Sequence, residues 1–346
     1  MNEPLKVAVI GCGLIGQWHH IPSLLKISNV KLVAICDENE DLARRVARTF
    51  GIGSYYTDFS KMLGAEQVNI MDICTPPQTH KDLTMRAIEA GCHVLVEKPI
   101  ALNLRDIDEI EKAARVNNIR VCQIHNFLFE PVMMKACTVV SEGRIGNVTG
   151  IDIQMLGSKS RDEPMLVDKK HWCHSLPAGI LTEMLPHPIY LAVAFLGKVE
   201  PVQTYTGKSR SYDWVVADEI RVVLKSEKGV GTISYSCNSA KNKVIIDIHG
   251  TRRHLRIDLW NSVMTGYGFG TETRTSRALE NLLQSFSILT NTTSTTLNVI
   301  TGKFHCGHYT LIRQFIQSIQ NNSEPPVTFQ QARDVIEVLE KITAQI

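Results

Sequence analysis

Hydrophobic and polar positions follow two different patterns along this chain of 346 residues. In the first part, short apolar runs rich in Val and Ile alternate with stretches whose apolar positions repeat at helical spacing. The apolar runs predict strands at residues 6–10, 31–36, 69–74, 93–96 and 120–124. The stretches between them predict helices at residues 15–25, 40–50, 79–90 and 106–116. Nearly continuous apolar strands are typical of a parallel sheet with helices on both faces, so we expect an α/β, doubly wound sheet.

The pattern changes after about residue 126, where strand follows strand. After a helix at 132–141, alternating apolar and polar positions predict strands at residues 149–156, 219–226, 230–236, 243–249 and 254–260. Turn signals between these strands favour a largely antiparallel sheet. Further helices are expected at residues 277–289, 308–320 and 329–346, and a polar run at 291–296 follows the first of them. We therefore expect two domains, residues 1–124 and an α+β domain at residues 125–346.

Composition narrows the classes of function. The chain is 44% hydrophobic and 21% charged, which supports packed cores and excludes wholesale disorder. A net charge of +2 without a block of like charges argues against binding to nucleic acid or to an anionic membrane. No apolar run reaches the ~18 residues of a transmembrane helix, and the N-terminal residues fit a strand and turn better than a signal peptide. Nine cysteines, spread singly, indicate a reducing compartment, so we expect a cytoplasmic protein without a disulfide framework.

Three glycines follow the first predicted strand and open the first predicted helix, which is the context that a dinucleotide-binding turn requires. Gly11 permits the tight turn, Gly13 lets a pyrophosphate approach the backbone, and Gly16 lets the helix pack close to the strand. The amides at the helix start, including those of Leu14 and Ile15, can then bind phosphate oxygens. The alternative is a glycine turn that binds no ligand.

Asp37 ends the second predicted strand, about 20 residues after the last glycine of the turn. An acid at this place accepts hydrogen bonds from the ribose hydroxyls and repels a 2′-phosphate. The residues that follow directly supply no cation, and Arg44 and Arg45 lie further along a helix. NAD is therefore favoured over NADP, although Asp37 could also serve as the N-cap of that helix.

Two further groups follow the ends of later strands, where open α/β sheets bind ligands. The first comprises Thr75, Pro76, Pro77 and His80, in which the two prolines fix a rigid loop. The second is Glu97-Lys98-Pro99. A lysine that emerges from a buried strand beside a nicotinamide would be partly desolvated, which suits a role in acid–base chemistry. The alternative for Lys98 is an ordinary surface lysine.

The glycine turn, the Thr-Pro-Pro loop, Glu97-Lys98-Pro99 and a later glycine-containing helix with a histidine together resemble the glucose–fructose oxidoreductase and inositol dehydrogenase family (Gfo/Idh/MocA). The resemblance covers nearly the whole chain, and Glu97-Lys98-Pro99 is its most specific element. It implies an N-terminal Rossmann domain and a C-terminal domain whose large open sheet binds substrate and forms oligomers. The implied reaction is an NAD-dependent hydride transfer between the nicotinamide and a carbinol carbon of a sugar, cyclitol or nucleotide-sugar. In many members the Lys-Pro peptide bond is cis.

In the family, one helix of the second domain carries an acid and, four residues later, a histidine. Glu183 and His187 have this spacing here and would share a helix face. In the implied mechanism His187, oriented by Glu183, takes the hydroxyl proton while hydride leaves the same carbon. Lys98 would hydrogen-bond the oxygen and stabilise the developing alkoxide.

The sequence departs from the family pattern around this histidine. Glu183 stands where Asp is usual, Leu185 where Gly is usual, and Tyr190 where an acid is usual. Pro186 and Pro188 lack amide hydrogens, so the helix is expected to end or kink there. Two alternatives to the dehydrogenase therefore stay open. One is a nucleotide-binding sensor or assembly protein without turnover, and the other is an NADP-linked reductase of ketosugars or diols.

Five residues are candidates for recognising the substrate, because they lie in this neighbourhood and sugar sites favour aromatic and amide groups. They are Asn126, Lys159, Trp172, His174 and Tyr190. Side chains that can ligate metals also cluster at residues 19–20, 171–174 and 305–308. None of these clusters has the paired spacing of a structural zinc site, so we expect no metal.

The helix predicted at residues 277–289 carries an apolar stripe formed by Leu279, Leu282, Leu283 and Phe286. An exposed stripe of this kind needs covering, which favours a homo-oligomer, either a dimer or a tetramer. The alternative is that the stripe packs on the sheet of its own domain. The polar face of this helix has little Lys or Arg, which argues against a role at a membrane surface.

Overall fold

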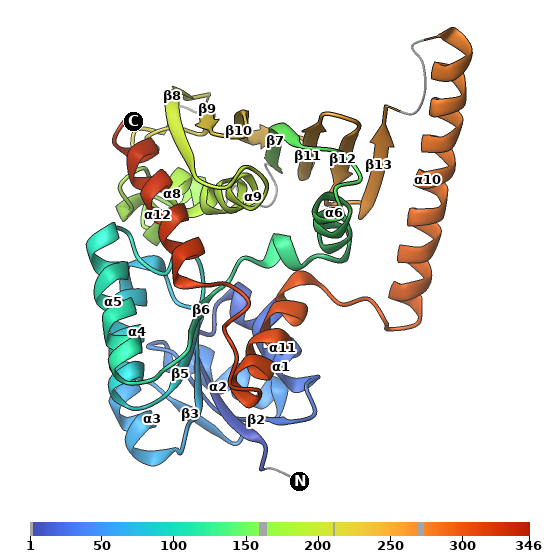
Figure 1. Ribbon diagram of the computed structural model, residues 1–346. Helices are drawn as coiled ribbons and strands as arrows, with labels where there is room; N and C mark the ends of the chain where they lie inside the picture. Colours follow the sequence, from blue (N-terminus) through green and yellow to red (C-terminus); the bar gives the residue numbers. More distant parts are fainter. Residues whose placement is uncertain (1–2, 159–164, 210–211, 269–272) are drawn as a thin grey trace. The chain divides into compact units, whose positions relative to one another are not determined.

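The computed structural model describes residues 3–158, 165–209, 212–268 and 273–346 (Figure 1). It divides into two compact units, Met1–Asn126 with Gly307–Ile336, and Phe127–Cys306 with Glu337–Ile346. The sequence predicts one boundary, between domains at residues 1–124 and 125–346. The structure instead assigns the later segment Gly307–Ile336 to the first unit. This segment returns there because Ala332 and Ile336 belong to the hydrophobic core of the first unit.

The first unit contains a six-stranded parallel sheet with the order β3-β2-β1-β4-β5-β6. Its strands are β1 (Leu5–Ile10), β2 (Val30–Cys36), β3 (Ser54–Tyr56), β4 (Ile70–Ile73), β5 (His93–Val96) and β6 (Val121–Gln123). The predicted doubly wound sheet is confirmed, and β3 alone has no counterpart among the predicted strands because three residues carry little pattern. The strand order reverses between β1 and β4, and sheets of this kind bind ligands outside the carboxyl ends of the strands at the reversal.

Helices connect the strands of the first unit. They are the π-helix η1 (Gly16–His20), α1 (Ile21–Leu25), α2 (Glu40–Phe50), α3 (Phe59–Ala65), the 3-10 helix η2 (Pro77–Thr79), α4 (His80–Glu89), α5 (Leu104–Val116) and α11 (Gly307–Gln320). The helix predicted at residues 15–25 is therefore two elements. The amide of Ile21 donates to the carbonyl of Gly16, and Pro22 near the start of α1 has no amide hydrogen to continue the ladder. α11 contacts η1 and α1, so a segment from the end of the chain supports the helix that follows the glycine turn.

The second unit contains a seven-stranded sheet with the order β13-β12-β11-β7-β10-β9-β8. Its strands are β7 (Val148–Ser158), β8 (Val199–Gly207), β9 (Glu219–Ser226), β10 (Val230–Ser239), β11 (Lys243–Gly250), β12 (His254–Asp258) and β13 (Val263–Tyr267). β7 and β10 are parallel and the other neighbouring pairs are antiparallel, which confirms the mostly antiparallel α+β unit. β8 and β13 have no counterpart among the predicted strands. In β8 only Val199 and Pro201 are buried, so the sequence lacks a regular alternation there.

The helices of this part of the chain are the 3-10 helix η3 (Asn126–Phe129), α6 (Pro131–Ser141), the 3-10 helix η4 (Trp172–Ser175), α8 (Ile180–Met184), α9 (Pro186–Leu196), α10 (Arg274–Ile300) and α12 (Phe329–Thr343), which begins in the first unit. α9 packs on β7, β8 and β10, and α6 packs on β12 and β13. Nine of the eleven residues of α9 are buried, as expected for a helix that is apolar on all sides. The side chains of α9 are therefore held by the core of the second unit.

α10 is longer than the sequence predicts. The helix expected at residues 277–289 runs on to Ile300 and includes the polar run at 291–296. Ser and Thr have modest helix propensity, and within this run the hydroxyl of Thr293 donates to the carbonyl of Leu289 one turn earlier. No residue of α10 is buried, and Leu282 and Phe286 are 68% and 66% exposed, so the sheet of its own unit does not cover the apolar stripe. No helix in the described part of the chain is both long and apolar enough to cross a membrane.

Candidate functional site

The three glycines of the turn have different surroundings. A Cβ on Gly11 would lie 2.7 Å from the carbonyl of Cys74, and a Cβ on Gly16 would lie 2.6 Å from the carbonyl oxygen of Gly11. Gly11 also has a φ of 92°, a conformation that favours glycine. A Cβ on Gly13 would meet nothing within 4 Å. Two glycines are therefore required by packing, whereas Gly13 borders open space that a ligand could approach.

Three consecutive residues directly before η1 are exposed. They are Gly13, Leu14 at 62% and Ile15 at 37%, whereas Gly16 is buried. This exposed segment leads into a helix start, which is where phosphate groups bind.

Asp37 lies at this turn, after the end of β2. Its Oδ2 accepts the amide of Cys12 at 2.8 Å, and its Oδ1 accepts the amide of Asn39 at 2.9 Å. The N-cap of α2 is Asn39, whose side chain accepts the amide of Leu42 at 3.0 Å. The alternative that Asp37 is the N-cap of this helix is therefore wrong. The structure fixes the carboxylate beside the glycine turn, as recognition of a ribose requires.

His80 connects the loop after β4 to the segment after β5. Its buried ring places Nδ1 2.7 Å from the carbonyl oxygen of Pro99 and Nε2 2.7 Å from that of Thr75. Burial lowers the pKa of His80, although hydrogen bonds to the two carbonyls oppose this shift. Pro76 and Pro77 form the start of η2 between these contacts. The two predicted loops are thus joined through one imidazole at the carboxyl edge of the sheet.

Lys98 is buried, with 7% of its surface exposed, directly after β5. Its amide donates to Glu97 Oε2 at 3.1 Å, and Glu97 is also 7% exposed. The peptide bond between Lys98 and Pro99 is cis, as the family resemblance implies. The burial of Lys98 argues against the alternative of an ordinary surface lysine.

A buried network of side chains contacts the carboxylate of Glu97. His20 places Nδ1 2.9 Å from both carboxylate oxygens of Asp72, and Nε2 3.0 Å from Glu97 Oε1. Nε2 of His308 lies 3.5 Å from the same oxygen of Glu97. The ring of His308 also stacks on that of His19, with 4.4 Å between centroids. The network therefore joins η1, β4, the end of β5 and α11.

The surroundings in this network shift the pKa values of His20 and Glu97 in opposite directions. Burial opposes charge on the imidazole, but interactions with Asp72 and Cys74 outweigh it and hold the pKa of His20 well above its usual 6.5. Burial likewise opposes charge on Glu97, but hydrogen bonds and charges of His20 and His308 hold the pKa of Glu97 well below its usual 4.5. Burial lowers the pKa of His308. Both shifts favour an ion pair between an imidazolium at His20 and the carboxylate of Glu97.

Side chains of this network could in principle ligate a metal. Ligand-type atoms of His20, Glu97 and His308 lie within 4.8 Å of one another, as do those of His20, Asp72 and Cys74. Both ring nitrogens of His20 already face carboxylate oxygens at hydrogen-bonding distance, so a metal would have to replace a proton shared between the imidazole and a carboxylate. The expectation of a protein without a metal stays a prediction.

In the second unit, His187 is 9% exposed and lies in α9. Its Nδ1 is 2.9 Å from the hydroxyl of Tyr190, and its ring stacks on Phe127 with 4.4 Å between centroids. The Tyr190 hydroxyl also accepts the amide of Phe127 at 3.1 Å. When Nδ1 carries the ring proton, it donates a hydrogen bond to the hydroxyl of Tyr190. Nε2 then keeps a lone pair that can accept a substrate proton. Tyr190 thus orients the ring, although it replaces the acid usual in the family.

The prolines beside His187 interrupt the helix for one residue, as predicted. α8 ends at Met184 and α9 begins at Pro186, with Leu185 between them in helical conformation. Proline is well tolerated at a first helical position, where its missing amide has no intrahelical partner. Glu183 and His187 therefore belong to successive helices, and the role of Glu183 in orienting His187 stays a prediction.

The other proposed substrate residues are distributed more widely. Asn126 is 6% exposed and belongs to the first unit. Trp172 and His174 lie in η4, where the ring of Trp172 packs against that of His171 at 5.0 Å. Lys159 lies outside the described residues.

Two pockets of the second unit include residues that the sequence analysis did not single out. One, of about 200 Å³, is lined by Phe127, Glu130, Leu259, Trp260, Ser262, Phe304 and Cys306. It shares Phe127 with the surroundings of His187. A sequence signal existed for one member, because Trp260 is a large aromatic residue at the end of the strand predicted at residues 254–260.

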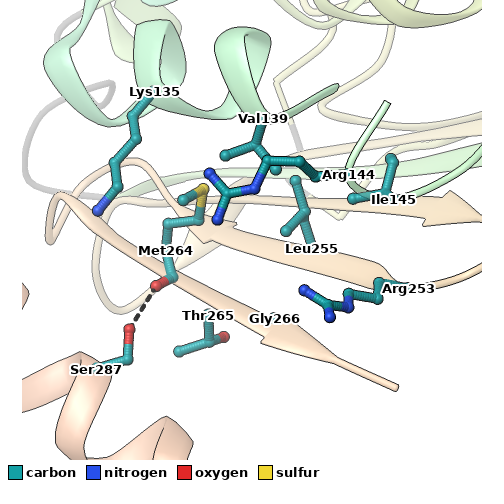
Figure 2. Close-up of a pocket in the computed structure, with 10 residues that line it drawn as sticks. All are labelled: Lys135, Val139, Arg144, Ile145, Arg253, Leu255, Met264, Thr265, Gly266 and Ser287. Carbon is teal, nitrogen blue, oxygen red and sulfur yellow. Dashed lines mark hydrogen bonds between the residues drawn. The ribbon is translucent and has the colours of Figure 1, made fainter. Parts of the chain in front are cut away.

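The other pocket, of about 260 Å³, lies between α6, the β12–β13 hairpin and α10. Figure 2 shows the cationic side chains of Lys135, Arg144 and Arg253 in its lining, and the hydroxyl of Ser287, which donates to the carbonyl of Met264 at 3.0 Å. Its lining does not include His187 or Tyr190, so we assign it no part in the chemistry.

Comparison with known proteins defines the class of this fold and site. The model of an oxidoreductase family with an NAD-binding Rossmann fold matches residues 5–125, and the model of the Gfo/Idh/MocA C-terminal domain matches residues 133–256. The protein is therefore an oxidoreductase with an NAD-binding domain. It belongs to the Gfo/Idh/MocA family, which confirms the resemblance stated from its motifs.

Several proteins similar in sequence to this chain are sugar dehydrogenases. Oxidoreductase P35 of Formosa agariphila is 25% identical over 77% of this chain and 83% of its own length. D-apiose dehydrogenase of Paraburkholderia graminis is 24% identical over 73% of this chain and 67% of its own length. The structure of the WlbA dehydrogenase from Chromobacterium violaceum, in complex with NADH and UDP-GlcNAcA, matches with a TM-score of 0.81 at 18% identity, over 100% of this chain and 94% of that one. The structural match supports the fold.

Because the glycines have different surroundings, substituting them by alanine should affect stability and NADH binding differently. Gly13→Ala should leave the free energy of unfolding within about 0.5 kcal/mol of the wild type but weaken NADH binding at least ~10-fold, because the methyl group enters the space for the pyrophosphate. Gly16→Ala should cost about 1–3 kcal/mol of stability, because its Cβ would overlap the carbonyl of Gly11. Urea unfolding and NADH fluorescence titration measure both quantities.

Gly64→Ala in α3 is the matched control, since its Cβ would also meet nothing within 4 Å. It should change neither NADH affinity nor, beyond a small gain in helix propensity, stability. If Gly13→Ala destabilised the fold and left NADH binding intact, the assignment of the turn to the pyrophosphate would be wrong.

The raised pKa of His20 predicts a pH-dependent contribution to stability. A folded pKa above the unfolded value of about 6.5 means that this contribution is complete below pH ~6.5 and declines above it, until it is lost beyond the folded pKa. The stability difference between wild type and His20→Gln should therefore fall by up to about 1.4 kcal/mol per pH unit above pH ~6.5. Urea unfolding of both proteins from pH 6 to 9 measures this difference.

His93→Gln is the control, because burial lowers the pKa of His93. Protonation of the wild-type ring then opposes folding, so the cost of this substitution should shrink toward low pH rather than grow. A cost of His20→Gln that is the same at pH 6 and pH 9 would show that His20 is not held as an imidazolium.

Proposed function

We propose that this chain is an NAD-dependent dehydrogenase that oxidises or reduces a carbinol carbon of a sugar, cyclitol or nucleotide-sugar. The observation that carries the proposal is the buried Lys98 directly after β5, in the same unit as the glycine turn and Asp37. A lysine in this place of a doubly wound sheet lies at the edge where such sheets bind nucleotides. Named relatives include dehydrogenases of D-apiose and levoglucosan, which supports a carbohydrate substrate.

The residues of the first unit fit a dinucleotide. Open space beside Gly13 leaves room for a pyrophosphate, and the fixed carboxylate of Asp37 can accept the ribose hydroxyls. When bound, the nicotinamide would accept or donate the hydride. Lys98 hydrogen-bonds the reacting oxygen and stabilises its developing negative charge.

In this proposal His187 exchanges the proton of the substrate hydroxyl. Nε2 accepts it during oxidation and returns it during reduction, while Nδ1 donates to Tyr190. The stack on Phe127 keeps the ring plane fixed, and burial excludes competing water. Glu183 is proposed to support this orientation from the preceding helix.

The proposal is tested by the absorbance of reduced nicotinamide. Purified protein with NAD is offered a panel of cyclitols, free sugars, methyl glycosides and UDP-sugars. Reduction of NAD by one class of substrate is the expected result. Binding of NADH without turnover of any member of the panel would instead favour a nucleotide-binding sensor that keeps the fold without the chemistry.

Lys98→Met should abolish turnover and spare the cofactor. The substitution keeps the length of the side chain and removes its charge, so kcat should fall at least ~100-fold while the Kd of NADH changes less than about 3-fold. Lys112→Met, at an exposed position of α5, is the control and should retain full activity. Turnover that persists in Lys98→Met would remove this lysine from the mechanism.

We also propose that NAD is preferred over NADP, on the evidence of the Asp37 carboxylate beside the turn. Asp37→Asn keeps the shape and removes the charge that repels a 2′-phosphate, so the ratio of NADPH to NADH affinity should rise about 10-fold. Asp41→Asn, which removes an exposed acid paired with Arg44 on α2, should leave the ratio unchanged. An unchanged ratio in Asp37→Asn would contradict the preference.

We further propose a homo-oligomer, a dimer or a tetramer, in which α10 packs on a second copy of the chain. A helix of 27 residues with an exposed apolar stripe is poorly stable without a partner. Light scattering should report more than one chain for the wild type and a single chain for the double variant Leu282→Glu/Phe286→Glu. The control Thr292→Glu should not dissociate, and a monomeric wild type would refute the proposal. The nine free cysteines support the cytoplasm as its compartment.

A further inference from the structure

The pocket of about 260 Å³ between α6, the β12–β13 hairpin and α10 has no task in the proposed reaction (Figure 2). All its described lining residues belong to the second unit, and none of them belongs to the proposed cofactor or proton-transfer sites. The lining nevertheless combines an apolar wall with cationic side chains. This combination is what a small ligand with an apolar body and a negatively charged head requires.

One part of the lining is apolar and belongs to the core of the second unit. Val139, Ile145 and Leu255 are 9%, 0% and 5% exposed. Gly266 lies opposite Leu255 in the register of β12 and β13, and it adds no side chain to the wall. Glycine within a strand often marks a place that a ligand approaches closely. Because drug-sized sites begin at ~300 Å³, the pocket fits a smaller body, such as one or two fused rings.

The other part of the lining is cationic. Figure 2 shows Lys135, Arg144 and Arg253 at separate points around the pocket. Among the described residues, none forms an ion pair with Lys135, which is exposed on α6. Arg144 lies 3.6 Å from Glu142, but both side chains are more than half exposed, so water screens this pair. Lys135 and Arg144 alone therefore offer two positive charges, and no described lining residue is an acid.

The turn that carries Arg144 is fixed by hydrogen bonds to the backbone. The amide of Arg144 donates to the carbonyl of Val139 at 3.1 Å, and the amide of Arg252 donates to that of Ile145 at 2.9 Å. The side chain of Arg252 also donates to the carbonyl of Gly143. Gly143 has a φ of 67°, the left-handed conformation in which helices commonly end. A wall held in this way is preorganised, so a ligand loses less affinity to ordering of the protein.

The remaining wall is α10, which no buried side chain attaches to the sheet. Its hydrogen bonds to the end of the hairpin include Ser287 to the carbonyl of Met264 at 3.0 Å and Glu280 to the amide of Gly268. Ser287 also lines the pocket together with Met264. An occupant would therefore contact α10 and β13 at the same time. A ligand that binds only the docked arrangement stabilises that arrangement by mass action.

We propose that this pocket binds a small organic anion and that the occupant fixes α10 against β13. The ligand is a carboxylate or a phosphate monoester on an apolar body of one or two rings. Lys135 and Arg144 bind its head, because ammonium and guanidinium groups donate charge-assisted hydrogen bonds to such oxygens. The apolar body lies on Val139, Ile145 and Leu255. Since the pocket is separate from the proposed reaction, its ligand is an effector rather than a substrate.

Calorimetric titration tests the site. With excess NADH occupying the proposed dinucleotide site, the probes are 1-naphthoate and 1-naphthyl phosphate, and the matched probes are 1-naphthalenemethanol, acetate and inorganic phosphate. Each naphthyl anion should bind at least ~10-fold more tightly than every matched probe, because these lack either the charge or the rings. The tighter naphthyl anion identifies whether the site prefers a carboxylate or a phosphate head.

A double variant assigns this binding to the pocket. Lys135→Gln/Arg144→Gln changes two exposed positions and should weaken both naphthyl anions at least ~10-fold. Lys225→Gln/Lys243→Gln is the control, because it removes the same charge from β9 and β11, outside the pocket. Its affinities should stay within about 2-fold of the wild type. Equal binding of 1-naphthalenemethanol or inorganic phosphate, unchanged affinity in Lys135→Gln/Arg144→Gln, or binding of neither naphthyl anion would overturn the site.

Hydrogen–deuterium exchange tests the effect on α10. Saturation of the wild type with the tighter anion should slow exchange of the amides at residues 280–291 at least ~3-fold, because the ligand bridges this part of the helix to β13. Lys135→Gln/Arg144→Gln at the same anion concentration should show no such slowing. Unchanged exchange at saturation of the wild type would overturn the claim that the ligand fixes α10. Neither measurement uses turnover, so failure of the proposed dehydrogenase is a separate result.

Discussion

A histidine and two acidic side chains share the interior of the first unit, where an uncompensated charge costs several kcal/mol. The imidazolium of His20 is bonded to Asp72 on one side and to Glu97 on the other. Because loss of one partner would leave the others unbalanced, the groups fix one another in a single arrangement. Glu97 uses its second oxygen to hold the amide of Lys98. The same histidine ends the helix that follows the glycine turn, so the network joins this helix to β4 and to the end of β5.

The second unit holds its proposed base in a different way. His187 contacts the hydroxyl of Tyr190 and the ring of Phe127. In the proposed function, the network of the first unit is the scaffold of the cofactor site, and His187 is the group that gains and loses a proton in each turnover.

Sequence reasoning predicted the first sheet closely because its strands are apolar throughout, and it predicted the glycine turn between a strand and a helix because the glycine spacing is a local signal. It missed β3, β8 and β13, which are short or largely exposed. The charged network was not anticipated, although Asp72 inside an apolar strand was a signal for a buried partner. The pocket of Phe127, Trp260 and Phe304 could not be predicted, since segments distant in sequence form it only after folding.

Hydride transfer itself is the most direct test of the account. The protein is incubated with NAD and with neutral sugars and cyclitols that carry deuterium on their ring carbons, and the nicotinamide is then analysed by mass spectrometry. The account predicts one deuterium on the reduced nicotinamide ring, derived from a carbinol carbon of one substrate class. A preparation that binds NADH but transfers no deuterium from any labelled substrate would contradict it, because the fold and the buried Lys98 would then serve binding without this chemistry.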